Sequence, residues 1–395
     1  MSPSTTPQLP VLIIGAGVAG LTLAQGLRLR SVPFRLFERY PQSYRFQGHR
    51  FRISNESHTA LGNSLFPTLK TLLERTAPDS PPLSPRYVDA TELVFPEPIP
   101  VIPPSVPVDR TWIRMLTALD IGDAIEYGKD LESYELAHDY VRVKFIDGST
   151  AYGQLLIGAD GINSRVRKQL QPDRKLLDLK RWILWGRTPL TEDLKEKLPP
   201  GLLSWCMCLD LENNVQTVVE PIIWSKSVKQ ESEDKLPDFS DYIYWVVCTA
   251  PSQYLDTLPR TTEEKKLYVE RVVETWHPAL KLLLRSASHD MSACTPVFSS
   301  KPDIEILRTA KPKSVLLIGD AAHPMSPMGG SGADTAIQDA TDLARTIAEG
   351  ITDDSITAFQ ARMGARAKEK IEHSFRGGQK FWRGGEWTDY SEVDM

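Results

Sequence analysis

The stretch VLIIGAGVAG, residues 11–20, leads into a segment with helical apolar spacing and then into FRLFE at 34–38. An apolar run, a glycine turn, a helix and a second apolar run make up a dinucleotide-binding βαβ unit. Gly15 makes the tight turn, Gly17 lets the backbone approach a pyrophosphate, and Gly20 allows close packing of the helix on the strand. The N–H groups that begin the helix face the anion. We therefore predict dinucleotide binding, the alternative being a glycine turn kept only for packing.

An acidic residue supports this prediction and narrows the choice of nucleotide. Glu38 stands eighteen residues after Gly20, where a carboxylate can accept hydrogen bonds from ribose hydroxyls. An acid there repels the 2′-phosphate of NADP, which leaves FAD or NAD. The adjacent Arg39 weakens that discrimination, so a further observation has to decide between the two.

The deciding observation is a second glycine cluster, GDAAHPMSPMGGSGAD at 319–334. Asp320 ends the apolar run SVLLIGD, where a carboxylate can bind a polyol such as a ribityl chain. A bare loop then enters a helix, so that N–H groups and the positive helix end point at the ligand. The loop residues concerned are Pro327, Gly329, Gly330 and Gly332. NAD is too short to use both turns, whereas FAD is long enough, and the second helix start then stabilises the reduced flavin ring.

The composition is that of an ordinary globular chain of 395 residues, 41% hydrophobic and 25% charged. A net charge of −5 without a basic run argues against a nucleic-acid or anionic membrane surface, so small molecules are the expected partners. No apolar run approaches the roughly 18 residues of a membrane helix, and MSPSTTPQLP at the start is not typical of a signal peptide. We expect a cytoplasmic location, buried free thiols at the four cysteines, and no metal site.

The order of motifs predicts an α/β fold: a Rossmann-like FAD-binding domain with an inserted antiparallel-sheet substrate domain and C-terminal helices. Ten of the thirty prolines lie between Pro78 and Pro107, which favours extended crossing segments there. Short aromatic-rich strands follow from residue 175. The expected division is 1–75, 110–174 and 299–350 for the three parts of the FAD-binding domain, 76–109 for the proline-rich crossing segments of the substrate domain, 175–298 for the substrate domain, and 351–395 for a C-terminal helical region.

Local patterns predict several elements within this frame. They are a helical stretch around 58–76, a helix at 110–119, a hairpin formed by 140–145 and 150–156, a helix at about 333–350, and helical turns that end before GGQKFWRGGEW at 377–387.

Three motifs, GAGVAG with Glu38, GADG at 158–161 and GDAAHPMSPMGG at 319–330, occur in this order over nearly the whole chain. Together they resemble the fingerprints of the single-component FAD-dependent aromatic hydroxylases, the para-hydroxybenzoate hydroxylase type of flavoprotein monooxygenase. The resemblance implies that Asp160 and Gly161 serve both the flavin and the nicotinamide cofactor. It also implies that Arg110 contacts FAD and that Arg52 lies near the pyrophosphate.

The second glycine loop departs from the family pattern. It reads GGSGAD where relatives often have GQGxN, so that Asp334 replaces an amide. If the Asp334 carboxylate points at the flavin ring, it opposes reduction. If it faces away as a first-turn helix residue, it has no such effect.

The resemblance implies a reaction in which NAD(P)H, as a transient cosubstrate, reduces the flavin and O2 then forms a flavin hydroperoxide. One oxygen atom passes to an apolar, aromatic or polyketide-like molecule of secondary metabolism, by hydroxylation or epoxidation. An aromatic-rich sheet over the flavin excludes water from this step. A substrate phenolate needs a base or a cation, and the candidate catalytic residues are His49, Arg187 and Tyr244, with Tyr242 beside them.

Other functions are compatible with the same motifs. An FAD-dependent dehydrogenase or double-bond reductase can use this scaffold without transferring oxygen, and a flavin-bound scaffold protein needs no turnover at all. A flavin reductase with two Rossmann domains fits poorly, because no second GxGxxG follows a strand.

Overall fold

The computed structural model describes residues 9–44, 49–81, 85–97, 105–304 and 314–395. Residues 1–8 of the stretch MSPSTTPQLP, and parts of the crossing segments expected at 76–109, lie outside these residues. Within the described ranges, no helix has both the length and the apolar character needed to span a membrane.

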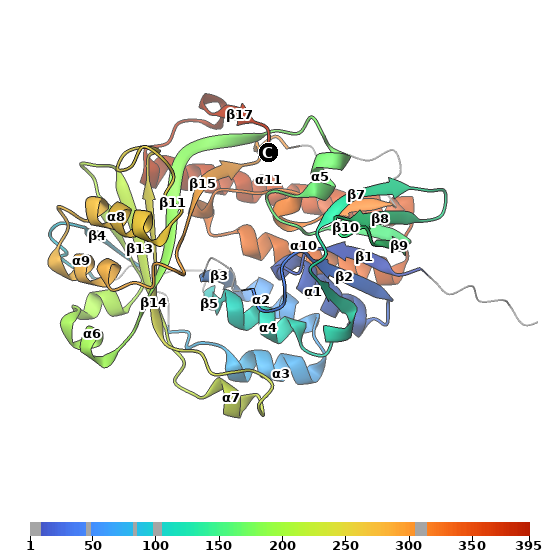
Figure 1. Ribbon diagram of the computed structural model, residues 1–395, viewed down its shortest axis with the longest axis horizontal. Helices are drawn as coiled ribbons and strands as arrows, with labels where there is room; N and C mark the ends of the chain where they lie inside the picture. Colours follow the sequence, from blue (N-terminus) through green and yellow to red (C-terminus); the bar gives the residue numbers. More distant parts are fainter. Residues whose placement is uncertain (1–8, 45–48, 82–84, 98–104, 305–313) are drawn as a thin grey trace, which may run out of the picture.

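A five-stranded parallel sheet carries the glycine motifs (Figure 1). Its order is β16–β10–β1–β2–β6, with β1 (Val11–Ile14), β2 (Phe34–Glu38), β6 (Ile125–Tyr127), β10 (Leu155–Gly158) and β16 (Val315–Leu317). Every residue of β1, β10 and β16 is buried, as expected for a parallel sheet covered on both faces. The carboxyl ends of these three neighbouring strands bring the three motifs to one edge of the sheet.

Two layers cover this sheet. Helices α1 (Val18–Leu29) and α10 (Gly332–Glu349) pack on each other, and their apolar residues share one core with the sheet. A small antiparallel sheet, β7 (Leu131–Leu136), β8 (Val141–Phe145) and β9 (Thr150–Gly153), joins the same core. The rings of Phe37 and Phe145, whose centroids are 4.7 Å apart, connect this small sheet to the parallel one.

The second large layer is a seven-stranded sheet ordered β15–β11–β14–β13–β12–β4, with β17 paired to β11. The pairs among β11 to β15 are antiparallel, whereas β4 runs parallel to β12. The strands are β4 (Arg86–Asp89), β11 (Leu176–Pro189), β12 (Cys206–Asp210), β13 (Val215–Ile222), β14 (Tyr242–Thr249), β15 (Ala293–Ser299) and β17 (Ser391–Val393). The short helices around it are α6 (Glu192–Lys197), α7 (Val228–Glu231), α8 (Thr262–Val272) and α9 (Pro278–Arg285).

A two-stranded ribbon stands between the two large sheets in Figure 1. It pairs β3 (Arg50–Ser54) with β5 (Ser105–Asp109), and helices α2 (Asn55–Asn63), α3 (Pro67–Thr76) and α4 (Arg110–Ala118) adjoin it. Helix α5 (Arg165–Leu170) follows the second motif, and α11 (Asp353–Trp382) packs along α10. The α/β class, the inserted antiparallel sheet and the C-terminal helices are thus confirmed.

Several local predictions need correction. The stretch 58–76 forms two helices rather than one, because Pro67 disfavours a helical residue before it and instead begins α3. The expected hairpin holds for β8 and β9, but Leu155 and Leu156 belong to the parallel sheet. Helix α11 runs through Gly377 and ends at Trp382.

Helices α8 and α9 lie where only strands were expected. The sequence did carry a signal for α8, since Thr261 and Glu264 form a capping box at its start.

Candidate active site

In the first glycine turn, the fold requires glycine at positions 15 and 20, whereas a Cβ at position 17 would meet no described atom. Gly15 has φ 102°, and a Cβ there would lie 2.5 Å from the carbonyl oxygen of Ala159. A Cβ on Gly20 would lie 2.0 Å from the carbonyl oxygen of Gly15. Around Gly17, no described atom lies within 4 Å of a Cβ position, and this residue directly precedes α1. The open side of the turn is where a pyrophosphate would approach the helix start.

The carboxylate of Glu38 is buried at the end of β2 and faces the same turn. It accepts the N–H of Ala16 at 2.9 Å and that of Tyr40 at 3.0 Å. The Nε–H of Arg114, on α4, donates to the Ala16 carbonyl at 3.0 Å. Burial lowers the pKa of Arg114 to about 10, with Glu38 opposing this shift. The predicted Arg39 is exposed, and its guanidinium lies over the Tyr40 ring.

Asp160, in the second motif, caps helix α5. Its carboxylate accepts the Ser164 hydroxyl at 2.5 Å and the N–H of Arg165 at 2.8 Å. Burial raises its pKa, and these hydrogen bonds oppose the rise. Gly161 adopts φ 76°, and none of the described atoms lies within 4 Å of a Cβ position there.

The third motif places Asp320 directly after β16, in the short turn Gly319–Ala321. Its side chain is accessible, yet burial within the fold raises its pKa, while His323, Arg110 and Arg167 pull the pKa down. An acid that is both accessible and deep inside the protein lies in a concave site. Gly332, the first residue of α10, is close by, since a Cβ there would be 3.9 Å from Asp320 Oδ1.

The loop that follows carries the remaining predicted glycines. Pro327 and Gly329 form a single 3-10 turn, and Gly330 follows with φ 61°. Asp334 is turned toward β3: its Oδ1 accepts the Ser54 N–H at 2.8 Å and the Ser54 hydroxyl at 3.2 Å. Asp334, the residue in GGSGAD that departs from the family pattern, thus connects α10 to the junction of β3 and α2.

Arg110 connects the third motif to the substrate sheet. Burial lowers its pKa, whereas Asp320 and then Tyr244 raise it by their proximity. Its Nε is buried without a hydrogen-bond partner among the described residues. A buried guanidinium with a free donor beside Asp320 is suited to a polar ligand group at this point.

The Arg52 side chain contacts the strands β13 and β5. Its Nη1 pairs with Glu220 on β13, and its Nε–H donates to the Ser105 hydroxyl at 2.8 Å. Arg50 pairs with the same Glu220 and lies over the Tyr244 ring, 4.6 Å from its centroid. Arg52 thus contacts residues of β5 and β13. The expected position of its guanidinium near the pyrophosphate remains a proposal.

His49 immediately precedes β3 and is 3% exposed. Burial lowers its pKa to about 3, and the charges of Arg187 and Arg110 act in the same direction. Its Nε2 is buried, and within the described part of the chain this atom has no hydrogen-bond partner. At neutral pH, His49 is therefore an uncharged imidazole with one free ring nitrogen.

The other candidates gather around His49. The guanidinium of Arg187 lies 3.9 Å from the centroid of the Tyr242 ring, and among the described residues it forms no ion pair. Tyr242 donates its hydroxyl to Asp109 at 2.7 Å, and its ring is 6.3 Å from that of His49. Burial raises the pKa of Tyr242 and of Tyr244, so both phenols stay protonated.

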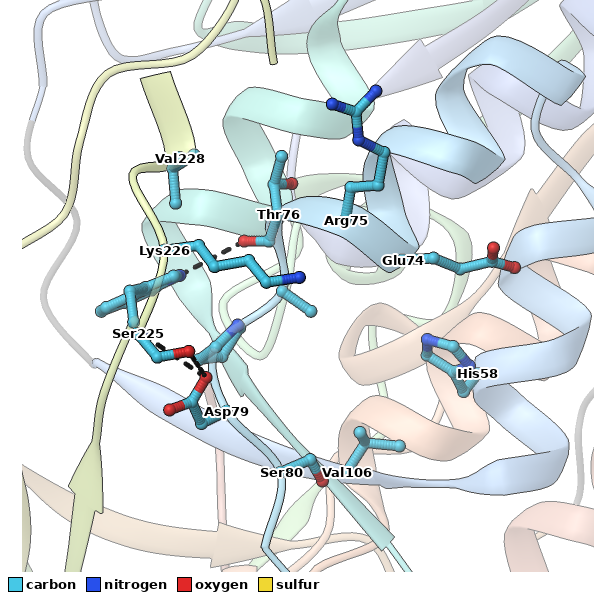
Figure 2. Close-up of a pocket in the computed structure, with 13 residues that line it drawn as sticks. His58, Glu74, Arg75, Thr76, Asp79, Ser80, Val106, Ser225, Lys226 and Val228 are labelled. Carbon is cyan, nitrogen blue, oxygen red and sulfur yellow. Dashed lines mark hydrogen bonds between the residues drawn. The ribbon is translucent and has the colours of Figure 1, made fainter. Parts of the chain in front are cut away.

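The described residues form two hollows whose lining residues the structure gives. Figure 2 shows the first, of about 360 Å³, with Lys226 reaching into it and with His58 and Glu74 at one side. Trp224 lines this hollow and also approaches the Tyr242 ring at 6.4 Å. The second hollow, of about 460 Å³, lies at 170–175 and 300–304. None of the predicted site residues is among the lining residues of either hollow, so both lie outside the predicted FAD groove.

The residues present fit FAD. The open face at Gly17 suits the pyrophosphate, Glu38 suits the adenosine ribose, and the accessible carboxylate of Asp320 suits the ribityl chain. The free donor of Arg110 suits a polar atom of the flavin end. The strand order β16–β10–β1 sets these groups along one sheet edge, and this double cradle defines an FAD-binding protein.

Comparisons with known proteins agree with this class. Residues 281–370 match the family model described as FAD binding domain. The dual O-methyltransferase/FAD-dependent monooxygenase elcB of Phaeosphaeria nodorum is 30% identical over 92% of this chain, but the match covers 42% of elcB. The FAD-dependent monooxygenase thnD of Trichoderma harzianum is 28% identical over 97% of this chain and 94% of its own. The chain thus spans less than half the length of the dual relatives that it matches.

Solved structures share the fold. Klebsiella pneumoniae HpxO, complexed with FAD and uric acid, superposes with a TM-score of 0.76 at 18% identity, over 96% of this chain and 91% of its own. For 2,6-dihydroxypyridine-3-hydroxylase from Arthrobacter nicotinovorans the TM-score is also 0.76, at 19% identity, over 95% and 93%. The chain is thus similar to FAD-dependent monooxygenases in sequence and to flavin hydroxylases in fold, and its match to an FAD binding domain supports FAD as the cofactor.

Three functional contacts were not predicted from the sequence. Arg114 bonds to the first turn, Glu220 pairs with two arginines, and Arg167 donates to the carbonyl oxygens of Asp320 and Ala321 at 3.3 Å. The last contact joins the second and third motifs. The helical spacing of Arg110 and Arg114 placed both on one face of a helix and could have indicated the first contact.

Proposed function

We propose that this protein is an FAD-dependent monooxygenase that uses NAD(P)H and O2 to insert one oxygen atom, by hydroxylation or epoxidation, into an apolar aromatic or polyketide-like molecule. One observation carries the proposal: Asp320 and Tyr244 both act electrostatically on Arg110, so Asp320 of the third motif and Tyr244 of the substrate sheet lie near the same guanidinium. In this proposal 1–75, 110–174 and 299–350 hold FAD, and 175–298 cover the substrate.

When bound and reduced by NAD(P)H, FAD activates O2, and the protein must keep water away from that chemistry. An aromatic cluster does so here. Tyr242 and Tyr244 are buried with Ile222, while Trp185 and Trp224 pack against them. Such a wall also favours a flat, apolar substrate.

Polar groups at the edge of this wall would orient the substrate. Arg187 presents a guanidinium over the Tyr242 ring, within electrostatic reach of Asp109, and this cation would hold a phenolate or enolate oxygen. The free Nε2 of His49, uncharged at neutral pH, would exchange a proton with a substrate hydroxyl. The protonated Tyr244 would donate a hydrogen bond.

The relatives named as dual O-methyltransferase/monooxygenases support a product that carries a hydroxyl group. Such a group on an aromatic ring is the kind of acceptor that an O-methyltransferase uses. The proposal includes a cytoplasmic location, supported by four cysteines that are all free thiols.

The test is a screen of phenolic and polyketide-like compounds with the FAD-loaded protein and labelled O2. A substrate should stimulate NAD(P)H oxidation and gain one labelled oxygen atom. An FAD-dependent dehydrogenase, the alternative, would convert the substrate without label and would also do so with an artificial electron acceptor in the absence of O2.

A matched pair of variants tests the role of Arg187. Arg187→Met should raise the KM for an ionised phenol by at least about tenfold, the loss of one charged hydrogen bond. Lys226→Met, in the neighbouring hollow, should leave the KM unchanged. Equal effects of both variants would remove Arg187 from the proposal.

A further inference from the structure

A buried carboxylate lies behind the third motif, on the face of α10 that packs against it. Asp339 has a side chain with 0% exposure. Its Oδ2 accepts the N–H of Gly319 at 3.1 Å, and its Oδ1 lies 3.1 Å from Arg366 Nη2. A buried charge with this many donors is held in one position.

A third donor to this carboxylate, like Gly319, belongs to the motif. His323 is 1% exposed, and its Nε2 lies 2.6 Å from Asp339 Oδ2. Its backbone N–H donates to the Gly319 carbonyl at 2.9 Å, which closes the turn around Asp320. Asp339 therefore binds both ends of the segment Gly319–His323, and Asp320 projects from between them.

The turn needs this restraint. Gly319 adopts φ 58°, a left-handed conformation, and a Cβ there would lie 3.2 Å from the Cβ of Ala336 on α10. A turn so close to a helix, with a conformation few residues adopt, depends on its anchoring hydrogen bonds. The negative charge of Asp339 is neutralised by Arg366 from α11. The Arg366 guanidinium also lies 3.4 Å from the Asp342 carboxylate.

We propose that Asp339 and His323 are positioning residues for FAD, holding the Gly319–Ala321 turn so that the Asp320 carboxylate meets the ribityl chain. The proposal rests on the assignment of Asp320 to FAD and goes beyond it, because neither Asp339 nor His323 faces the groove.

The experiment measures FAD binding to apoprotein by titration, together with the thermal unfolding of the apoprotein and the visible absorption of the bound flavin. Asp339→Asn removes the negative charge of the carboxylate that accepts hydrogen bonds from His323, the Gly319 N–H and Arg366. Its FAD dissociation constant should rise by at least about tenfold, the effect of losing one hydrogen bond to a charged group.

Asp342→Asn is the matched control. Asp342 lies one turn further along α10, pairs with Arg345, Arg362 and Arg366, and is 9% exposed. This variant also removes arginine pairs but leaves Gly319 untouched. It should lower the unfolding temperature while keeping the FAD dissociation constant within about twofold of the unmodified protein.

Two substitutions of His323 keep the proposal testable if Asp339→Asn fails to fold. In His323→Gln, an amide N–H can replace the Nε2 donor, so FAD affinity should stay close to that of the unmodified protein. His323→Leu removes the donor and should weaken FAD as Asp339→Asn does.

Equal FAD affinity in His323→Gln and His323→Leu would overturn the proposal, as would equal losses in Asp339→Asn and Asp342→Asn. Because binding is measured without turnover, this result does not depend on the proposed oxygen insertion.

Discussion

Gly17 and Gly20 belong to one motif but have different surroundings. A Cβ at Gly20 meets the protein backbone at 2.0 Å, whereas a Cβ at Gly17 meets none of the described atoms within 4 Å. Gly20 is therefore needed by the fold. The spacing GxGxxG predicts that Gly17 faces the phosphate, and the open space around it is consistent with that prediction.

We expect Gly17→Ala to weaken FAD binding at least about tenfold, because the new methyl group occupies the approach of the pyrophosphate. The unfolding free energy of the apoprotein should change by less than about 1 kcal/mol, the usual range for a change at a helix start. Gly20→Ala is the control and should destabilise the apoprotein by about 1–3 kcal/mol or more through overpacking. FAD titration and urea unfolding separate the two effects, and a Gly17→Ala variant that retains full FAD affinity would contradict this assignment.

His49 supports a prediction about pH. In the unfolded chain its pKa is near the ordinary 6.5, and in the folded protein burial lowers it to about 3. Below pH 6.5 the unfolded state binds a proton that the folded state does not, so His49 costs about 1.4 kcal/mol of stability per pH unit as the pH falls from 6.5 towards 3. Above pH 6.5 the cost vanishes.

The measurement is the unfolding free energy of the unmodified protein and of His49→Gln between pH 7.5 and 5. Other groups titrate equally in both proteins, so the difference between the two curves isolates His49. The variant should lose less stability on acidification. Parallel curves would show that the His49 imidazole has the same pKa in the folded and the unfolded protein.

At the scale of elements, sequence patterns located most strands and helices but not their ends. Helix α10 was expected near 333–350 and runs from Gly332 to Glu349. Its amphipathic spacing is a local pattern that can be read from a single sequence. Helix α11 was expected to end at the paired glycines, yet it continues because its side chains pack on the Pro327–Gly329 turn. Tertiary contact, which no local pattern contains, outweighed the low helix propensity of glycine.

The paired glycines of α11 supply a test of that packing. A Cβ on Gly377 would lie 2.7 Å from the carbonyl oxygen of Met328, in the Pro327–Gly329 turn, whereas the nearest contact of a Cβ on Gly378 is 3.6 Å, to Trp382. Gly378→Ala should raise stability by up to about 1 kcal/mol through helix propensity. Gly377→Ala should instead displace the turn and weaken FAD. Thermal unfolding with and without FAD would reveal the difference, and identical behaviour of the two variants would exclude a brace between α11 and the turn.

At the scale of the whole molecule, a buried ion cluster that the sequence did not indicate joins the β3–β5 ribbon to the seven-stranded sheet. Arg50 and Arg52, on β3, both pair with Glu220, on β13. Some 170 residues separate the partners along the chain. Only the folded topology brings them together, whereas the motifs that identified FAD are each contained in a short segment. This difference explains why the cofactor was predictable and the contacts between the sheets were not.

Glu220→Gln tests whether this cluster holds the substrate sheet in place over the flavin groove. The carboxylate side chain is 5% exposed and those of Arg50 and Arg52 are 10% and 12% exposed, so the amide would leave two cations buried without a counter-charge. Removal of one partner from such a cluster costs about 3–5 kcal/mol. Glu231→Gln breaks the exposed pair with Arg75 and should cost less than about 1 kcal/mol. Urea unfolding followed by tryptophan fluorescence compares the two variants, and a loss at Glu220 no larger than that at Glu231 would mean that apolar packing alone joins the ribbon to the seven-stranded sheet.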